Sequence, residues 1–426
     1  MQTGRILRMT ALVWGQIGYA ILLVCILDAL VALIIWAFRT RPVNELQFAD
    51  VYNGASWTAQ YYREHDSLRV AWHPYVDYIA LPYRGRYFNV GADGLRVTSP
   101  RKAAAAACRR PLRIFLFGGS TVFGYGVRDD YTIPSWLQRM LDEKSGCAAV
   151  YNYGQDGYVS TQELLFLQEQ LRKGNVPDLV IFYDGFNDSW VAVQNGEAGT
   201  TTDEPYRQKS FRMVNWLHGE DRRLLYESAA FTLLNHSALG EVAKRIVSLL
   251  APGSYKVVQG ELVNLRLDDP GIPGAAQDMP SQIVRIYLAN TRSAQALAKQ
   301  YGFGFLSYWQ PSVFQKLSLT PWERRQAESD VPAVQTCIEA TSRMMSGLAQ
   351  QYSVIDISGL FRDQTRPIFV DEVHLSDNGN RLVAERMMRD VMPLVAALSS
   401  RTKAHPSASA GPDQSSNQRI ESSGRN

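Results

Sequence analysis

The sequence has little of what metal sites and redox centres are made of. It contains four cysteines and six histidines among 426 residues. No Cys-x-x-Cys pair occurs, and no two histidines stand at i and i+4 with a glutamate between them. Zinc sites and metalloproteases need such spacings. We therefore expect no metal ion and no cofactor.

A large excess of charge of either sign is also missing. The 44 Lys and Arg residues and 41 Asp and Glu residues leave a net charge of +3. No basic run carries interleaved aromatic residues, so nothing supports nucleic-acid binding. The 46% hydrophobic and 20% charged residues suffice for a buried core, which excludes wholesale disorder.

Two motifs of other enzyme classes are incomplete. Gly119 and Gly124 have the spacing of a phosphate-binding loop, but Tyr125 and Gly126 stand where Lys and then Ser or Thr should follow. Val122 occupies the position where the nucleophile elbow Gly-x-Ser-x-Gly requires glycine. A nucleotide site and an α/β-hydrolase fold are therefore disfavoured.

The sequence does have one long apolar run near its N-terminus. Residues 17–38 contain thirteen Ile, Leu, Val and Phe residues and one charge, Asp28. A bilayer core needs about 20 residues, and the apolar side chains favour insertion by roughly 4–8 kcal/mol against about 3 kcal/mol for the aspartate. A cleavable signal peptide is the alternative, but Trp36-Ala-Phe-Arg offers no small-residue cleavage site. We favour an uncleaved signal anchor behind a cytoplasmic stub at 1–16.

The charges around the apolar run do not decide on which side of the membrane the rest of the chain lies. Two arginines precede the apolar run and two follow it, so the positive-inside count nearly balances. Cys108 lies four residues before the first expected strand, and Cys147 lies three before the second. If these strands are neighbours, a disulfide is geometrically plausible and implies an oxidising compartment, whereas two unpaired thiols are the alternative. We expect the body to be extracytoplasmic, in the periplasm or cell envelope.

Four short residue groups, far apart in the chain, have the side-chain types that acyl transfer requires. Three directly follow apolar runs at 112–117, 150–153 and 179–183, which are typical of buried parallel strands. The fourth follows a short apolar run at 354–357 and a loop. Because parallel strands of an α/β sheet bring their carboxyl ends to one crevice, the groups should meet there. The four groups are Gly118-Gly119-Ser120, Asn152-x-Gly154-x-x-Gly157, Gly185-x-Asn187-Asp188 and Asp371-x-x-His374.

Each group has an expected role. Ser120, on a Gly-Gly turn between strand and helix, is the candidate nucleophile, His374 is its base, and Asp371 orients the imidazole. The oxyanion needs preorganised donors, each worth about 3–4 kcal/mol of barrier, and the amides of Ser120 and Gly157 and the side-chain amide of Asn187 are suitable. Taken singly, each group can be explained as a helix cap or a chain turn. All four in this order favour a serine hydrolase.

This set of groups resembles the SGNH hydrolase superfamily, which includes the GDSL lipases and esterases. Ser120 matches the serine of that family, Gly157 and Asn187 match its oxyanion glycine and asparagine, and Asp371 with His374 matches its Asp-x-x-His pair. The first family block usually reads Gly-Asp-Ser-Leu, whereas this chain has Gly-Gly-Ser-Thr. The missing aspartate is not the nucleophile.

The resemblance covers residues 110–190 and 300–395, and it implies an α/β fold with three layers around a parallel, flavodoxin-like central sheet. It also implies hydrolysis of an acyl ester, either an O-acetyl group on a glycan or a lipid ester. An O-acyltransferase of envelope polysaccharide and a non-catalytic SGNH-like module that binds a glycan or an assembly partner stay open as alternatives. Trp190 could stack on a sugar ring, although a packing role is commoner. The sequence does not indicate an oligomeric state.

The remaining segments define the domain organisation. Residues 39–104, rich in aromatics and turns, should form short strands or a hairpin on the core, and residues 105–400 the hydrolase domain. A surplus at about 190–278 should be a largely helical insertion that either covers the site or packs far from it. Residues 401–426, dominated by small and polar residues, should be a disordered tail. The other expected elements are helices at 133–143, 162–172, 224–250, 283–301, 334–352 and 379–398 and a strand at 303–308.

Overall fold

The computed structural model describes the hydrolase body almost completely and parts of the segments around it. The described residues are 2–38, 44–101, 110–144, 147–202, 204, 207–208, 237–250, 255–258, 261–264, 278–329 and 332–404.

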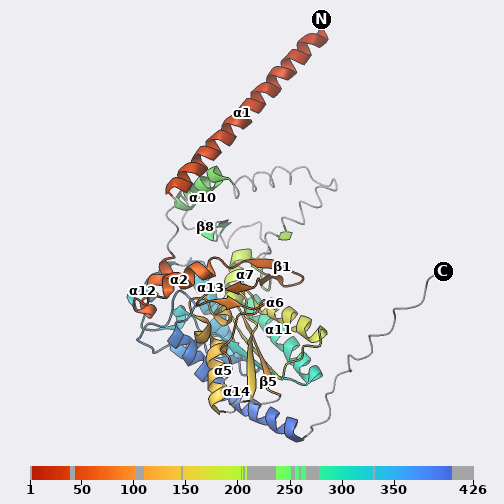
Figure 1. The fold of residues 1–426 in the computed structure, drawn as a ribbon, viewed down its shortest axis with the longest axis vertical. Helices are drawn as coiled ribbons and strands as arrows, with labels where there is room; N and C mark the ends of the chain where they lie inside the picture. Colours follow the sequence, from red (N-terminus) through yellow and green to blue (C-terminus); the bar gives the residue numbers. More distant parts are fainter. Residues whose placement is uncertain are drawn as a thin grey trace, which may run out of the picture.

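A five-stranded parallel sheet forms the centre of the body (Figure 1). Its order is β11-β10-β7-β5-β6. Counted along the chain within this sheet, the second strand lies at one edge and is followed by the first, third, fourth and fifth. This flavodoxin-like order confirms the expected fold class. The strands are β5 (Leu112–Gly118), β6 (Ala148–Asn152), β7 (Leu179–Asp184), β10 (Gly304–Trp309) and β11 (Ile355–Asp356).

Helices cover both faces of the sheet. On one face, α5 (Ile133–Lys144) packs against α14 (Asp377–Ala404), and on the other face α6 (Ser160–Arg172) packs against α11 (Met279–Tyr301). Each helix lies at the expected place to within four residues at its start. The body therefore has the three layers implied by the resemblance.

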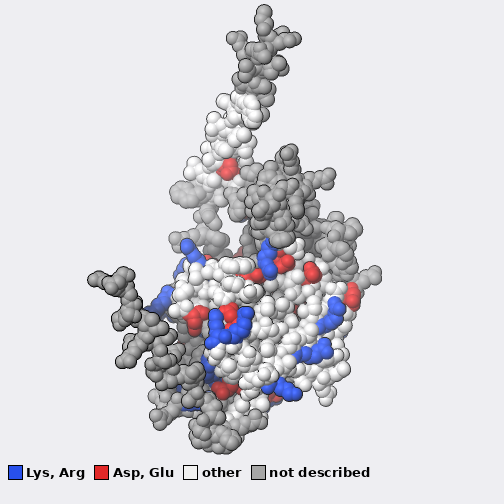
Figure 2. Space-filling model, turned by 90° about the vertical axis from the view of Figure 1, so that its right-hand side faces the viewer, with Lys and Arg blue, Asp and Glu red and all other residues white. Residues whose placement is uncertain are grey.

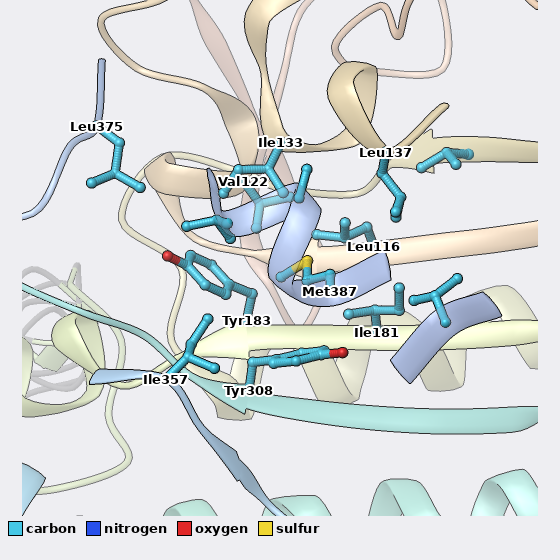
Figure 3. Close-up of a cluster of buried hydrophobic side chains, with 14 of the residues drawn as sticks. Leu116, Val122, Ile133, Leu137, Ile181, Tyr183, Tyr308, Ile357, Leu375 and Met387 are labelled. Carbon is cyan, nitrogen blue, oxygen red and sulfur yellow. The ribbon is translucent and has the colours of Figure 1, made fainter. Parts of the chain in front are cut away.

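Alternation along β5 fills both cores. Ile114 and Leu116 belong to the apolar cluster beneath α5 and α14, whereas Phe115 and Phe117 belong to the cluster beneath α6 and α11. All four side chains are buried, which explains why the strand is a continuous apolar run. Figure 3 shows the first cluster, in which Met387 of α14 lies among side chains from the sheet.

Residues 44–101 form an N-terminal segment that packs beside the carboxyl ends of the strands. Its two antiparallel strand pairs agree with the expected hairpin, but helix α2 was not expected, because eight residues are too few to show a helical period. Tyr61 and Tyr62 of α2 are buried in a cluster with Phe123 and Val370. The elements are η1 (Glu45–Phe48), η2 (Asp50–Tyr52), α2 (Thr58–His65), β1 (Val70–His73), β2 (Asp77–Ala80), β3 (Tyr83–Arg84) and β4 (Asn89–Val90).

The insertion expected at 190–278 is only partly described. Its described residues form both a helix and a β-hairpin, so it is less uniformly helical than expected. The part of the helix expected at 224–250 that precedes residue 237 lies outside the described residues. The elements are α7 (Phe186–Asn195), which leads into the insertion, and α10 (Ala238–Leu250), β8 (Tyr255–Val258) and β9 (Glu261–Asn264). The other elements of the body are one longer helix, α13 (Pro332–Leu348), and the short elements α4 (Ser120–Phe123), η3 (Asp129–Tyr131), η4 (Val313–Gln315), α12 (Pro321–Ser329) and η5 (Ser358–Phe361).

Helix α1 (Gln2–Phe38) is continuous and includes the residues expected as a stub at 1–16, apart from the first. Within the described part of the chain, Trp14–Ile35 is the one stretch long and apolar enough to cross a membrane. Figure 2 shows the described part of this helix projecting from the body with a mostly uncharged surface. Asp28 Oδ1 accepts a hydrogen bond from the amide of Leu239, at the start of α10, at 2.9 Å. The charge in the apolar run therefore has a partner outside α1.

The cysteines and the C-terminus complete the fold. Cys147 is disulfide-bonded, whereas Cys25 and Cys337 are free. The expected partner, Cys108, lies outside the described residues. Helix α14 ends at Ala404, inside the segment expected as a disordered tail, and the rest of that segment also lies outside the described residues.

Arg96 joins the N-terminal segment to the loop that follows α4. Its side chain is fully buried, and its Nε forms an ion pair of 3.0 Å with Asp129 Oδ1. Its two terminal nitrogens donate to the carbonyl oxygens of Phe123 at 2.9 Å, of Val127 at 2.6 Å and of Gly124. One guanidinium thus satisfies three backbone carbonyls and one carboxylate.

Replacing this guanidinium should strongly destabilise the protein. Arg96→Met would remove the buried cation that pairs with Asp129 and one donor from each of three carbonyl oxygens, at a cost of about 3–5 kcal/mol. We expect this loss in the free energy of unfolding measured by denaturant titration. The exposed Arg84→Met is the control, with a change within about 0.5 kcal/mol. Equal effects of the two substitutions would contradict the role assigned to Arg96.

Candidate active site

The expected nucleophile, base and orienting carboxylate come together in one hydrogen-bonded chain. Ser120 begins α4 directly after β5, and Asp371 and His374 lie in the loop before α14. His374 Nε2 lies 2.7 Å from Ser120 Oγ, and His374 Nδ1 lies 2.7 Å from Asp371 Oδ2. A neutral imidazole whose Nδ1 donates to the carboxylate leaves Nε2 to accept the serine proton.

The loop that carries His374 is held from several sides. The amide of Val370 donates to the carbonyl of His374 at 2.8 Å. Asp371 Oδ1 accepts the amides of Val373 at 3.0 Å and His374 at 2.8 Å. The next residue, Leu375, is buried in the core cluster of Figure 3. Hydrogen bonds to the backbone of His374 and of its neighbours therefore position the imidazole, together with the hydrogen bonds of the ring itself.

The expected oxyanion donors lie around Ser120. Asn187 packs so closely on Gly119 that a Cβ at that glycine would collide with Asn187 Nδ2. The same nitrogen donates to the carbonyl of Tyr158 at 2.8 Å. Gly157, next to Tyr158, has a φ of +73°, which favours glycine. The Asn187 amide thus packs directly on the residue that precedes Ser120.

Asn152 and Gly154 support α4 from the opposite side. Asn152 Nδ2 donates to the carbonyl of Val122 at 2.9 Å, and Asn152 Oδ1 accepts the amide of Gly154 at 3.0 Å. A Cβ at Gly154 would collide with the backbone nitrogen of Phe123. The second residue group therefore holds the turn that presents Ser120.

A comparison with known families is consistent with this geometry. The sequence pattern of the GDSL-like Lipase/Acylhydrolase family matches residues 116–382. The chain belongs to this family. It is therefore a hydrolase that acts on ester bonds. This membership disfavours the alternative of a non-catalytic module that only binds a glycan or an assembly partner.

Solved structures similar to this GDSL acylhydrolase share little sequence with it. A lipolytic protein of the G-D-S-L family from Desulfitobacterium hafniense is 11% identical, with 65% of this chain and 98% of that chain covered and a TM-score of 0.33. An acetyl xylan esterase is 15% identical, with 66% and 100% covered and a TM-score of 0.35. A carbohydrate acetylesterase from Sinorhizobium meliloti is 12% identical, with 66% and 99% covered and a TM-score of 0.35. No curated protein matches the chain.

The imidazole and its carboxylate shift each other's protonation. Burial disfavours the charged form of His374, but the negative charge of Asp371 and its hydrogen bond outweigh burial and raise the pKa of His374 above its ordinary value. Burial alone would raise the pKa of Asp371, but the charge of His374 and the hydrogen bonds to the ring and two amides lower it. The acylhydrolase thus keeps an ionised carboxylate against a base whose protonated form is stabilised.

Side chains that no sequence motif indicated lie beside His374. The ring of Tyr125 lies 4.5 Å from the ring of His374. On the N-terminal segment, His65 lies 4.7 Å from the ring of Tyr125, and its Nε2 lies 3.0 Å from Asp156 Oδ2. The only signal in the sequence was the aromatic content of residues 39–104, which does not reveal that this segment reaches the strand ends.

Two other expectations concern Trp190 and metal ions. Trp190 packs against an apolar cluster that includes Phe186, Ile283 and Val334, which agrees with the packing role rather than with sugar stacking. Among the described residues, no group of three or more His, Cys, Asp and Glu could hold a metal ion.

Three buried carboxyl groups lie next to the oxyanion groups in the chain. Burial raises the pKa of Glu163, of Asp188 and of Asp184, the last to about 8. The negative charge of Asp184 adds to burial in raising the pKa of Glu163, so the two carboxyl groups keep a proton between them at neutral pH. Asp188 Oδ1 accepts the hydroxyl of Ser160 at 2.6 Å and its amide at 3.2 Å. These bonds tie the start of α6, after Gly157, to α7, which carries Asn187.

The raised pKa of His374 should appear in the pH dependence of the esterase reaction. The neutral imidazole is the active form, so kcat/KM should rise as pH passes the raised pKa. In Asp371→Asn this acid limb should move to lower pH, and kcat should fall by roughly 10³–10⁴-fold. The control is Asp363→Asn, an exposed carboxylate, and pH–rate profiles provide the measurement. An acid limb that stays in place in Asp371→Asn would refute the electrostatic coupling.

The buried carboxyl pair should make stability fall with rising pH. The folded protein keeps a proton that the unfolded chain releases above a pKa of about 4, so the free energy of unfolding should decrease as pH rises from about 4 to about 8. The double variant Glu163→Gln/Asp184→Asn should show a smaller decrease in denaturant titrations across this range. Glu385→Gln, on an exposed face, should follow the wild-type profile. A double variant with an unchanged pH slope would speak against the shared proton.

Proposed function

We propose that the protein is a membrane-anchored serine esterase in which Ser120, His374 and Asp371 form the catalytic triad. The observation that carries the proposal is the hydrogen-bonded chain Ser120 Oγ, His374 Nε2, His374 Nδ1, Asp371 Oδ2, with 2.7 Å at both steps between side chains. Membership of the GDSL-like family supports the same reaction class.

In the proposed mechanism, His374 Nε2 takes the proton of Ser120 as Oγ attacks the ester carbonyl carbon. The resulting oxyanion is stabilised by the amides of Ser120 and Gly157 and by Asn187 Nδ2. His374 then returns the proton to the leaving alcohol oxygen as the C–O bond breaks, and an acyl-enzyme remains. Water, deprotonated by His374, attacks the acyl carbon and releases the carboxylic acid and Ser120.

The anchoring part of the proposal rests on α1. Its segment Trp14–Ile35 has the length and mean hydropathy, 2.7, of a membrane span, and none of it is buried in the protein. Beside α1, helix α10 exposes Ile246, Leu249 and Leu250, which extends the apolar surface. A disulfide at Cys147 supports an oxidising compartment, such as the periplasm or cell envelope. The substrate in this proposal is an acyl ester on an envelope glycan or lipid.

A fluorophosphonate probe tests the nucleophile. The full-length protein in detergent should take up the probe at Ser120, and Ser120→Ala should take up none and lose about 10⁴–10⁶-fold in kcat/KM. The matched control is Ser293→Ala, which removes an exposed hydroxyl from α11 and should leave both readouts unchanged. Equal labelling of wild type and Ser120→Ala would assign the nucleophile to another residue.

An ester panel tests the reaction and the acyl chain. Esters from acetyl to long acyl chains show whether the acyl pocket is short or long, and adding acceptor glycans shows whether the acyl group is transferred rather than released. Acylated acceptor as the main product would replace the esterase by an O-acyltransferase with the same triad.

A further inference from the structure

A second histidine–carboxylate pair lies beside the triad. His65 ends α2, and Asp156 lies in the loop between β6 and α6, 91 positions away in the chain. Their side chains meet at 3.0 Å, between His65 Nε2 and Asp156 Oδ2, and keep 13% and 35% of their surface exposed. The proposed reaction does not use this pair.

The pair is close to the reacting groups. The ring of Tyr125 lies between the two imidazoles, with centroids 4.7 Å from His65 and 4.5 Å from His374. Asp156 directly precedes Gly157, whose amide is a proposed oxyanion donor. The charge of Asp156 also contributes to the raised pKa of His374, which places the carboxylate within electrostatic range of the base. A ligand at His374 that extends past the ring of Tyr125 would therefore approach the pair.

Asp156 has unused hydrogen-bonding capacity. Its Oδ2 faces His65, but its Oδ1 is shielded from solvent and has no hydrogen-bond partner among the described residues. The side chain nevertheless keeps 35% of its surface exposed, and a carboxylate oxygen can accept a second hydrogen bond, so a donor supplied by a ligand can bind the accessible part of the carboxylate. A hydroxyl group is such a donor.

A purely structural function explains the pair less well. The N-terminal segment is already fixed to the body by Arg96 and by hydrogen bonds from Tyr52 and Tyr61 to the loop after α4. A partly exposed ion pair contributes only about 0–1 kcal/mol. A similar link, His73 Nε2 to Glu169 Oε2 at 2.7 Å, connects the same segment to α6 without touching Tyr125 or the triad. That link provides a natural comparison for the His65 pair.

We propose that Asp156, oriented by His65, is a hydroxyl-binding subsite for the alcohol half of the ester, and that the substrate carries its acyl group on a polyol with a free hydroxyl beside the esterified one. His374 must reach the leaving oxygen, so a group on the same side as His374 contacts the alcohol rather than the acyl chain. The ring of Tyr125 contacts His65 and so lines the subsite, as aromatic side chains commonly line ligand sites. The hydroxyl of Tyr78 donates to the carbonyl of Asp156. The inference rests on the proposed role of Ser120.

A pair of matched esters tests the subsite. Cyclohexyl acetate and trans-2-hydroxycyclohexyl acetate differ only by the neighbouring hydroxyl. Wild type should prefer the hydroxy ester, and Asp156→Ala should lose roughly 10–100-fold in kcat/KM for this ester, the range expected for one hydrogen bond to a charged group. The loss for cyclohexyl acetate should stay below about 3-fold. Rates are compared on the pH plateau, because removing the Asp156 charge lowers the pKa of His374.

His65→Gln should show a smaller loss of the same kind, because it frees Asp156 to rotate. The control His73→Gln removes the other histidine–carboxylate link and should leave both esters and their ratio unchanged. Thermal unfolding of all variants separates a weakened tether from a lost subsite.

The remaining outcomes are distinct. Equal losses for both esters in Asp156→Ala, no loss for either, or a wild type without preference would each overturn the subsite. Turnover that survives in Ser120→Ala would overturn the proposed function instead. Acetylated methyl glycosides and monoacetylglycerol then distinguish the source of the polyol, since a higher kcat/KM for one of them assigns the subsite to a glycan or to a glycerolipid.

Discussion

The hydrogen bond between His374 Nε2 and Ser120 Oγ joins residues 254 positions apart. The packing of the rest of the body holds these two residues in contact. Ser120 is fixed by the end of the central strand β5, and His374 by a short loop whose next residue, Leu375, enters the core. A hydrogen bond of this length tolerates little displacement, so both ends depend on the packing of α14 and α5 on one face of the sheet.

The N-terminal segment packs against the candidate active site. Its buried Arg96 satisfies the carbonyls of the loop after α4, and this loop carries Tyr125 against His374. Its helix α2 brings His65 to Asp156. The same residues that fix the segment to the body thus shape the surroundings of the base, which links the stability of this region to the specificity proposed for it.

The oxyanion side is organised by polar groups that are themselves buried. Asp188 binds Ser160, Asn187 binds the carbonyl of Tyr158, and Glu163 and Asp184 keep a proton between them. The hydrogen bonds of Asp188 and Asn187 connect the loops that follow β6 and β7, the two strands on either side of β5, which ends at Ser120.

The sequence by itself determined the strands, the parallel sheet and the four residue groups at the strand ends, because buried strands are rich in consecutive apolar residues and acyl transfer needs particular side-chain types. It also indicated the apolar N-terminal run. It could not determine which surface residues 44–101 would cover, since an eight-residue helix and two short hairpins carry no long-range signal. The tertiary structure alone decided that Tyr125, His65 and Asp156 meet beside His374 and that the Asn187 amide packs on Gly119. These are contacts between segments far apart in the chain, and such contacts depend on how the layers pack rather than on any local pattern.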